Sequence, residues 1–338
     1  MRRHVHIRWV ALLACALLFA ACGSTSSVAG VGHSPTATLA PPTAAPSSAG
    51  SVSATISLPA KSKLYSMAVT ATSAWIHVVD AARVLRIDPK TNQVVASIPV
   101  GQGTGEVALE GGFVWVMNHI DSTISKIDPQ TNKVVATISL PPPNGHLAVS
   151  PGAVWVSSLS GNVVRRLDPR TNHVVATIAM PNGPAGMSFG AGSLWVCGWN
   201  GAVWRVDPAT NQATKQFDIG AVYGLLCAGI AALEDTVWVE VFLGQNDTGS
   251  VLERIDPAAN TLGTQSFTMP DNLNEGVVAD AHGGWVYDPE HGLYHIDPQT
   301  NQVVGQLLMT GGGGLALGDG SVWFPTSDGK LLRITPAS

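Results

Sequence analysis

The sequence has 338 residues, a formal net charge of −5 at pH 7, 45% hydrophobic residues and 12% charged residues. A negative chain with so few charges argues against DNA or RNA as the main partner, because nucleic-acid affinity rests largely on neutralising phosphates. The 36 glycines and 22 prolines indicate a globular chain that is rich in turns.

Residues 1–21 have the pattern of an export signal. Arg2, Arg3 and Arg8 precede an apolar run at 9–21 that is too short to span a bilayer as a stable helix. The run FAAC at 19–22 resembles a bacterial lipobox and predicts a lipid on Cys22. The alternatives are an ordinary signal peptide with an incidental cysteine, and acylation of Cys15 after a very short apolar run. Removing residues 1–21 leaves a formal charge of −8.

Residues 22–51 follow as a predicted disordered tether. After the cysteine they are mostly Ser, Thr, Ala, Pro and Gly, and such a stretch buries too little apolar surface to offset its ordering entropy. We therefore expect an extracytoplasmic, membrane-anchored lipoprotein, at the cell surface or in the periplasm, whose folded domain spans residues 52–338.

Internal repetition dominates the rest of the chain. The phrase [IVL]DP recurs six times and degenerates to ITP at the end, and a tryptophan precedes each copy by 12 to 18 residues. The Asp positions are Asp88, Asp128, Asp168, Asp207, Asp256, Asp297 and, in the last copy, Thr335. The tryptophans are Trp75, Trp115, Trp155, Trp195, Trp238, Trp285 and Trp323. Two independent markers thus define the same seven units.

Each unit contains four short strand-like runs. In the second unit they lie at 106–109, 113–118, 123–127 and 133–138, and they alternate or are β-branched between Gly, Pro, Asn and Asp residues. Four strands in about forty residues, repeated seven times, predict an all-β fold, a seven-bladed β-propeller.

The DPxTN sequence of most units has the chemistry of a turn. Asp accepts hydrogen bonds from nearby backbone N–H groups, Pro presets φ, and Asn tolerates a left-handed conformation. The alternative is calcium binding, which needs several ligands on one ion, whereas these carboxylates lie on separate blades. The tryptophans are predicted to fill the wedges between blades, with ligand stacking as the alternative.

The repeat is split between the chain ends. Residues 52–59 (VSATISLP) form a repeat tail without a head, and residues 331–338 (LLRITPAS) form a head without a tail. We therefore predict that strand 52–58 closes the ring as the outer strand of the last blade, paired with 330–334, which removes an exposed sheet edge. Cys197 and Cys227 could form a disulfide or remain two buried thiols.

These repeats resemble two related propeller groups. WVMN at 115–118 with IDPQTNKVVATI at 127–138 resembles the YVTN-repeat family, and VWFPTSDGKLLRITP at 322–336 resembles the virginiamycin B lyase-like group. The first resemblance implies an extracytoplasmic surface or periplasmic protein, often without known activity. The second implies metal-assisted opening of a cyclic ester, with His, Glu and Mg²⁺ at inner-strand positions.

Candidate chemistry lies at the channel mouth. The position nine residues before each tryptophan marks the start of an inner strand, and most residues there are small: Ser66, Glu106, His146, Gly186, Gly229, Gly276 and Gly314. Glu106 and His146 stand out on adjacent blades, and Glu275 lies one residue from its frame. These three are the candidates for catalysis and for a divalent cation such as Mg²⁺, against the alternative of solvated polar residues in a wet channel.

The loops expected on the same face supply further candidates. His119, His291 and Glu290 lie between second and third strands. The fifth unit has long insertions at 221–229 and 243–250, so Trp199, Tyr223, Asn246 and Asp247 are secondary binding candidates. Two other motifs carry little weight: GMSFG at 186–190 falls on a predicted strand rather than a strand-to-helix elbow, and GGGG at 311–314 lacks the Lys-Ser/Thr and helix of a phosphate loop.

The sequence therefore favours a non-enzymatic binding or scaffolding module, expected to be a monomer. It would bind a protein, glycan or small-molecule ligand through one face and the membrane through its lipid. The alternative is a lyase-like enzyme with metal-assisted acid–base chemistry at the channel mouth.

Overall fold

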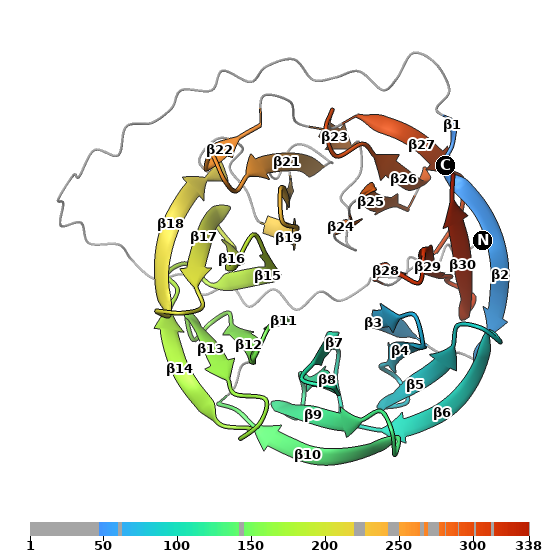
Figure 1. Ribbon diagram of the computed structural model, residues 1–338, viewed down its shortest axis with the longest axis horizontal. Coiled ribbons are helices and arrows are strands. Elements are labelled where there is room, and N and C mark those ends of the chain that lie inside the picture. Colours follow the sequence, from blue (N-terminus) through green and yellow to red (C-terminus); the bar gives the residue numbers. More distant parts are fainter. Residues whose placement is uncertain are drawn as a thin grey trace, which may run out of the picture. The chain divides into compact units, whose positions relative to one another are not determined.

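The computed structural model describes residues 47–59, 63–141, 145–219, 227–242, 250–263, 267–269, 277–280, 282–289, 291–300, 302–311 and 314–337. Their strands form seven sheets, and Figure 1 shows these sheets as blades around a ring. The predicted all-β, seven-bladed propeller is confirmed. Across these ranges, no helix is long and apolar enough to cross a membrane.

The first four blades are regular and run from an inner to an outer strand. Blade 1 contains β3 (Leu64–Thr70), β4 (Ser73–Val78), β5 (Arg83–Asp88) and β6 (Gln93–Pro99). Blade 2 contains β7 (Val107–Glu110), β8 (Phe113–Asn118), β9 (Thr123–Asp128) and β10 (Lys133–Ser139). Blade 3 contains β11 (Leu147–Ser150), β12 (Ala153–Ser158), β13 (Val163–Leu167) and β14 (Val174–Ala179). Blade 4 contains β15 (Pro184–Gly190), β16 (Ser193–Gly198), β17 (Ala202–Asp207) and β18 (Gln212–Asp218).

The other three blades depart from this pattern. Blade 5 contains β19 (Cys227–Ala232), β20 (Val237–Phe242) and β21 (Ser250–Asp256), and both β22 (Thr261–Leu262) and β23 (Phe267–Met269) pair with β21. Blade 6 contains β24 (Val277–Asp280), β25 (Gly283–Asp288), β26 (Gly292–Ile296), β27 (Val303–Leu307) and the short β1 (Ser47–Ser48). Blade 7 contains β28 (Ala316–Gly318), β29 (Ser321–Pro325), β30 (Lys330–Pro336) and β2 (Gly50–Ser57).

The ring closes as the split repeat predicts. β2 pairs antiparallel with β30, with Val52 opposite Ile334 and Ser57 opposite Lys330, and Figure 1 shows β2 outside β30. Ile56 is buried in the cluster shared by blades 7 and 1. Ordered strand structure begins earlier than the expected boundary at residue 52, because β1 pairs in parallel with β27 and Ala49 is buried behind it. Residues 47–51, expected to belong to the tether, thus belong to the sheets.

The DPxTN sequences form turns between third and fourth strands. In the second turn the Asp128 carboxylate accepts a hydrogen bond from the N–H of Gln130 at 2.8 Å, and the other turns repeat this contact. This backbone bond is the main reason that the pKa of Asp128 lies below its usual value. Asn132 adopts φ of 55°, in the left-handed region that Asn tolerates. The structural interpretation of the motif therefore holds.

All seven repeat tryptophans are buried, with at most 1% of each residue exposed. A cation from the third strand lies over several of them: Arg86 is 5.0 Å from the ring centroid of Trp75, and Arg166 is 5.3 Å from that of Trp155. The packing role predicted for these rings is the one the structure has, and the cations add an attraction that the sequence reasoning did not consider.

The same cations join each blade to the next. Arg86 donates hydrogen bonds to the carbonyl of Pro129 at 2.7 Å and to Oδ1 of Asn132 at 3.0 Å, in the DPxTN turn of blade 2. Lys126, Arg166, Arg205, Arg254 and Arg333 likewise reach the turn of the following blade. His295 occupies this position in blade 6 and stacks on Trp285 instead. Its successor, blade 7, is the unit whose DPxTN sequence degenerates to TPAS.

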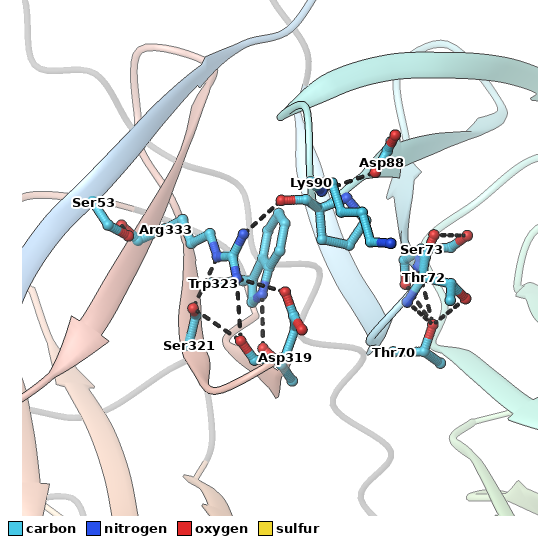
Figure 2. Close-up of polar contacts among 12 residues, drawn as sticks. Ser53, Thr70, Thr72, Ser73, Asp88, Lys90, Asp319, Ser321, Trp323 and Arg333 are labelled. Atoms are coloured by element: carbon cyan, nitrogen blue, oxygen red, sulfur yellow. Dashed lines mark hydrogen bonds and ion pairs between the residues drawn. The ribbon is translucent and has the colours of Figure 1, made fainter.

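Figure 2 shows this contact at the junction of blade 7 with blade 1. Arg333 of β30 donates to the carbonyl of Pro89 in blade 1 at 2.6 Å, to Oδ2 of Asp319 at 2.6 Å and to Oγ of Ser321 at 2.8 Å, with its guanidinium over Trp323. We call the six cation-to-turn contacts the interblade seam. The seam closes the ring at a second point, separate from the β2–β30 pairing.

Candidate functional site

The inner-strand starts lie at one level of the channel, opposite the ends of the second strands. The backbone N–H of Met117 donates to the carbonyl of Glu106 at 3.0 Å, and that of Ser157 donates to the carbonyl of His146 at 2.9 Å. Gly186 and Gly229 pair with Cys197 and Glu240 in the same way. We call the face with these starts and with the loops between second and third strands the top face; the DPxTN turns lie at the opposite end of the third strands.

Glu106 and His146 come together as the sequence predicts. Nδ1 of His146 lies 2.6 Å from Oε1 of Glu106, and Oε2 of Glu106 accepts the backbone N–H of Leu147 at 3.2 Å. The backbone N–H of His146 donates to Oγ of Ser157 at 2.8 Å. The Glu106 and His146 side chains are 24% and 40% exposed, so the pair is fixed by its partners yet open to solvent.

The pair favours a charged imidazole. Burial lowers the pKa of His146, but the charge of Glu106 and its hydrogen bond raise it by more, so the pKa lies above the usual value. The geometry places an imidazole and a carboxyl group in contact at the start of two neighbouring inner strands, and the raised pKa of His146 favours the charged imidazole.

A second histidine, His77, lies near Glu106 and was missed by the sequence reasoning. It is fully buried at the end of β4, and its Nδ1 lies 2.9 Å from the carbonyl of Gly105. Burial lowers its pKa, against smaller opposing effects of the Gly105 contact and the Glu106 charge. The lowered pKa of His77 favours its neutral form, and its Nδ1 faces the Gly105 carbonyl just before blade 2. Its position two residues after Trp75, opposite the inner-strand starts, was the available signal.

Three other candidates lie in the described part of the chain, and none has a hydrogen bond or ion pair to Glu106 or His146: His119, Trp199 and His291. His119 is exposed in the second-to-third-strand loop of blade 2, and its backbone N–H donates to the carbonyl of Thr104 at 3.3 Å. Trp199 is 49% exposed in the equivalent loop of blade 4. His291, in blade 6, bonds to the buried Asp288 through both its backbone N–H and Nδ1.

Several predicted residues lie outside the described residues: Cys22, Tyr223, Asn246, Asp247, Glu275, Gly276 and Glu290. The third candidate of the channel-mouth trio, Glu275, is among them. Within the described ranges no three His, Cys, Asp or Glu side chains lie close enough together to hold a metal ion. Glu106 and His146 bond to each other through Oε1 and Nδ1, so a divalent cation at this pair would need further ligands from outside the described residues.

Two glycine-rich motifs have structural roles. Ser188 of GMSFG lies within β15, where its Oγ accepts the N–H of Ala232 in blade 5 at 2.9 Å, so it is not on a nucleophile elbow. In GGGG, the N–H of Gly311 donates to the hydroxyl of Tyr287 at 2.7 Å, and a side chain at Gly311 would collide with the ring of Phe324. The residues between Gly311 and Gly314 are outside the described part.

Cys197 and Cys227 form a disulfide, which settles the alternative that the sequence left open. Their sulfur atoms are 1.96 Å apart, and the bond joins β16 of blade 4 to the start of β19 in blade 5. This junction lies at the level of the inner-strand starts. Blades 4 and 5 are therefore covalently linked.

Comparison with solved structures agrees with this fold. A streptogramin B lyase structure has a TM-score of 0.65 and 15% sequence identity, covering 83% of this chain and 97% of its own. The WD40 domain of Pan2 from Neurospora crassa has a TM-score of 0.66 and 9% identity, covering 84% of this chain and 94% of its own.

These likenesses concern the fold, since both identities are low. No protein-family model matches the sequence, and no curated protein matches it. The predicted resemblance to virginiamycin B lyase-like propellers is therefore confirmed for architecture. The chain is a seven-bladed β-propeller similar in fold to a streptogramin B lyase and to a WD40 domain.

Proposed function

We propose that this protein is an exported, lipid-anchored β-propeller that binds a ligand on its top face, at the channel mouth formed by Glu106 and His146. The carrying observation is the partly exposed ion pair between them, at positions where most other blades have Gly or Ser. A rigid scaffold that holds two partly exposed polar groups in fixed positions can orient a polar ligand, whether protein, glycan or small molecule.

Two observations support export and anchoring. Residues 1–22 have the charge, apolar run and cysteine of a lipoprotein signal. The Cys197–Cys227 disulfide agrees with an oxidising compartment, because such bonds persist mainly outside the cytosol. The protein would then act outside the cytoplasm, held to a membrane by lipid on Cys22.

The anchor is tested by changing its cysteine. Cys22→Ala should move the protein from the membrane fraction to the soluble extracytoplasmic fraction, measured by fractionation and immunoblotting. Cys15→Ala is the matched control and should leave the protein in the membrane fraction. Membrane retention of Cys22→Ala without another anchor would refute the proposal, and release of Cys15→Ala alone would move the lipid to that residue.

The binding site is tested with a panel of glycans and small molecules. A ligand that binds the native protein should lose at least tenfold in affinity in Glu106→Gln and in His146→Gln, because each change removes a charged hydrogen-bonding group, worth about 1.4 kcal/mol per tenfold. Glu110→Gln, at the other end of the same inner strand, is the control. Equal binding by all variants would exclude the channel mouth.

A lyase-like enzyme is the second candidate, favoured by the fold likeness to a streptogramin B lyase. Its discriminating experiment is a thermal-shift titration with Mg²⁺. A metal site that includes Glu106 should raise the melting temperature by mass action, and Glu106→Gln should abolish the rise. If Mg²⁺ does not raise the melting temperature of the native protein, the metal-assisted lyase hypothesis is rejected and the binding-module proposal remains.

A further inference from the structure

A groove of about 630 Å³ runs between blades 1 and 2, away from the Glu106–His146 pair. On one side it is lined by Pro99, Val100 and Gly101, where the chain leaves β6 for blade 2. On the other side it is lined by residues of blade 2: Asp121, Thr123, Ser125, Val134 and Thr137. Its volume falls in the range of small-molecule sites, roughly 300–1,000 Å³.

The groove exists because blade 2 has a small side chain where the other blades have large ones. Ser125 lies three residues before the turn Asp, and the equivalent residues are Leu85, Arg165, Trp204, Glu253, Tyr294 and Leu332. At the junction of blades 3 and 4, Trp204 packs against the cluster that contains Met180. At the junction of blades 7 and 1, Leu85 packs in the cluster with Leu58. Ser125 and Val100 leave the corresponding space open.

The hydroxyl groups in the groove are oriented from behind by Asn118. Its side chain is fully buried, and Nδ2 donates to Oγ1 of Thr123 and to Oγ of Ser125, both at 2.9 Å. Both hydroxyls thus accept from the amide and retain their own hydrogens to donate. Gly101 packs directly on this amide: an added Cβ would lie 2.7 Å from Cγ of Asn118. The donors are therefore held in place by a buried neighbour.

The remaining lining defines the ligand chemistry. Asp121 is exposed, and its Oδ2 accepts the N–H of Gln102 at 2.8 Å, which fixes the carboxylate at the rim. Pro99, Val100 and Val134 supply an aliphatic wall, and none of the lining residues is cationic. A carboxylate without a cation disfavours an anionic ligand. Hydroxyl donors, a carboxylate acceptor and an aliphatic wall together suit a molecule with ring hydroxyls and an apolar C–H face.

We propose that this groove between blades 1 and 2 is a binding site for a neutral saccharide. The carboxylate of Asp121 accepts hydrogen bonds from sugar hydroxyls, Thr123 and Ser125 donate to sugar oxygens, and the C–H face of the ring lies on Val100 and its aliphatic neighbours. The site is independent of the channel mouth, because none of its lining residues belongs to the Glu106–His146 pair.

The test uses glucose, N-acetylglucosamine and maltose as probes, with affinity measured by NMR titration of the backbone amides of Thr123, Ser125 and Thr137. At least one sugar should shift these resonances saturably in the native protein. Thr137→Tyr should weaken it at least tenfold, because a tyrosine on this exposed strand position projects a large ring at the groove. Asp121→Asn should weaken it about five- to tenfold by removing a charged acceptor.

Thr177→Tyr is the matched control. Thr177 occupies the same position on β14, also exposed, but pairs with Arg165, whereas Thr137 pairs with Ser125. The Thr177→Tyr variant should bind sugar within about twofold of the native protein, because Thr177 lies beside Arg165 on blade 3 and does not line the groove. The proposal is overturned if no sugar shifts these amides, or if Thr137→Tyr binds sugar as well as Thr177→Tyr does.

Discussion

The interblade seam and the top face are built on opposite principles. Along the seam the same hydrogen bond from a third-strand cation to the next turn recurs six times, and five of these cations lie over the buried tryptophan of their own blade. On the top face the described contacts between blades are of different kinds: a His–Glu hydrogen bond joins blades 2 and 3, and a disulfide joins blades 4 and 5. Repetition marks the parts that hold the ring, and departure from repetition marks the parts available for function.

The exception within the seam supports this distinction. Blade 6 carries His295 where the other blades carry Arg or Lys, and its successor lacks a DPxTN turn to receive a hydrogen bond. The cation and the turn are therefore present together and absent together. The cation at this position serves to bond the DPxTN turn of the following blade. Its replacement by His295, before the blade that lacks this turn, therefore needs no functional explanation.

The largest expected effect comes from removing the closing strand. A chain that begins at Ala60 lacks β2, so Ile56 no longer fills the core between blades 7 and 1 and β30 becomes an open edge. We expect a loss of roughly 4–6 kcal/mol in the free energy of unfolding, from buried apolar surface and lost strand pairing. Urea denaturation measures it. A chain that begins at Ser47 should match the processed protein, and equal stability of both chains would contradict the closure.

A smaller loss is expected from the seam itself. Arg333→Met keeps an apolar stem over Trp323 but removes the hydrogen bonds to Pro89, Asp319 and Ser321. The expected cost is about 2–3 kcal/mol, because the buried Pro89 and Ser321 lose a charged donor. Urea denaturation again supplies the measurement. Lys90→Met, on the same turn but exposed, is the control and should stay within about 0.5 kcal/mol. Similar values for both variants would show that the seam contributes nothing.

The smallest stability effect should come from the top-face pair. Because Glu106 raises the folded-state pKa of His146, the pair stabilises the fold below the unfolded-state pKa of about 6.5, and this contribution fades as the pH rises through the raised pKa. Glu106→Gln should therefore cost less than about 1 kcal/mol, mainly at acidic pH, since both side chains are partly exposed.

The titration of the pair can be followed directly. In NMR spectra the His146 imidazole should titrate above its usual pKa in the native protein and shift downward in Glu106→Gln. His77 has the opposite sign: its pKa is lowered by burial, so it favours the fold at higher pH and opposes it as the pH falls. An unchanged His146 titration in Glu106→Gln would contradict the ion pair.

The sequence alone determined the architecture, because each repeat has the same pattern of strand and turn residues and therefore forms the same four-stranded blade. The spacing of the tryptophans and of DPxTN set the blade number, and the tail without a head at 52–59 predicted the closing strand. It also predicted the meeting of Glu106 and His146, since equivalent positions on neighbouring blades lie side by side in a ring. The seam cations were equally periodic, two residues before each turn Asp, but their partners lie 42 to 52 residues away, and 244 residues away for Arg333, so they emerge only when blades are packed.

Only the tertiary structure decided the contacts that do not repeat. The disulfide required Cys197 and Cys227 to face each other across two blades, and their separation of 30 residues gave no such information. The groove beside Ser125 depends on volume missing between two packed sheets. His77 is fully buried, with its Nδ1 at the Gly105 carbonyl of the next blade's entry segment. Each of these features depends on residues of a neighbouring blade, and only the packing of the blades brings those residues into contact.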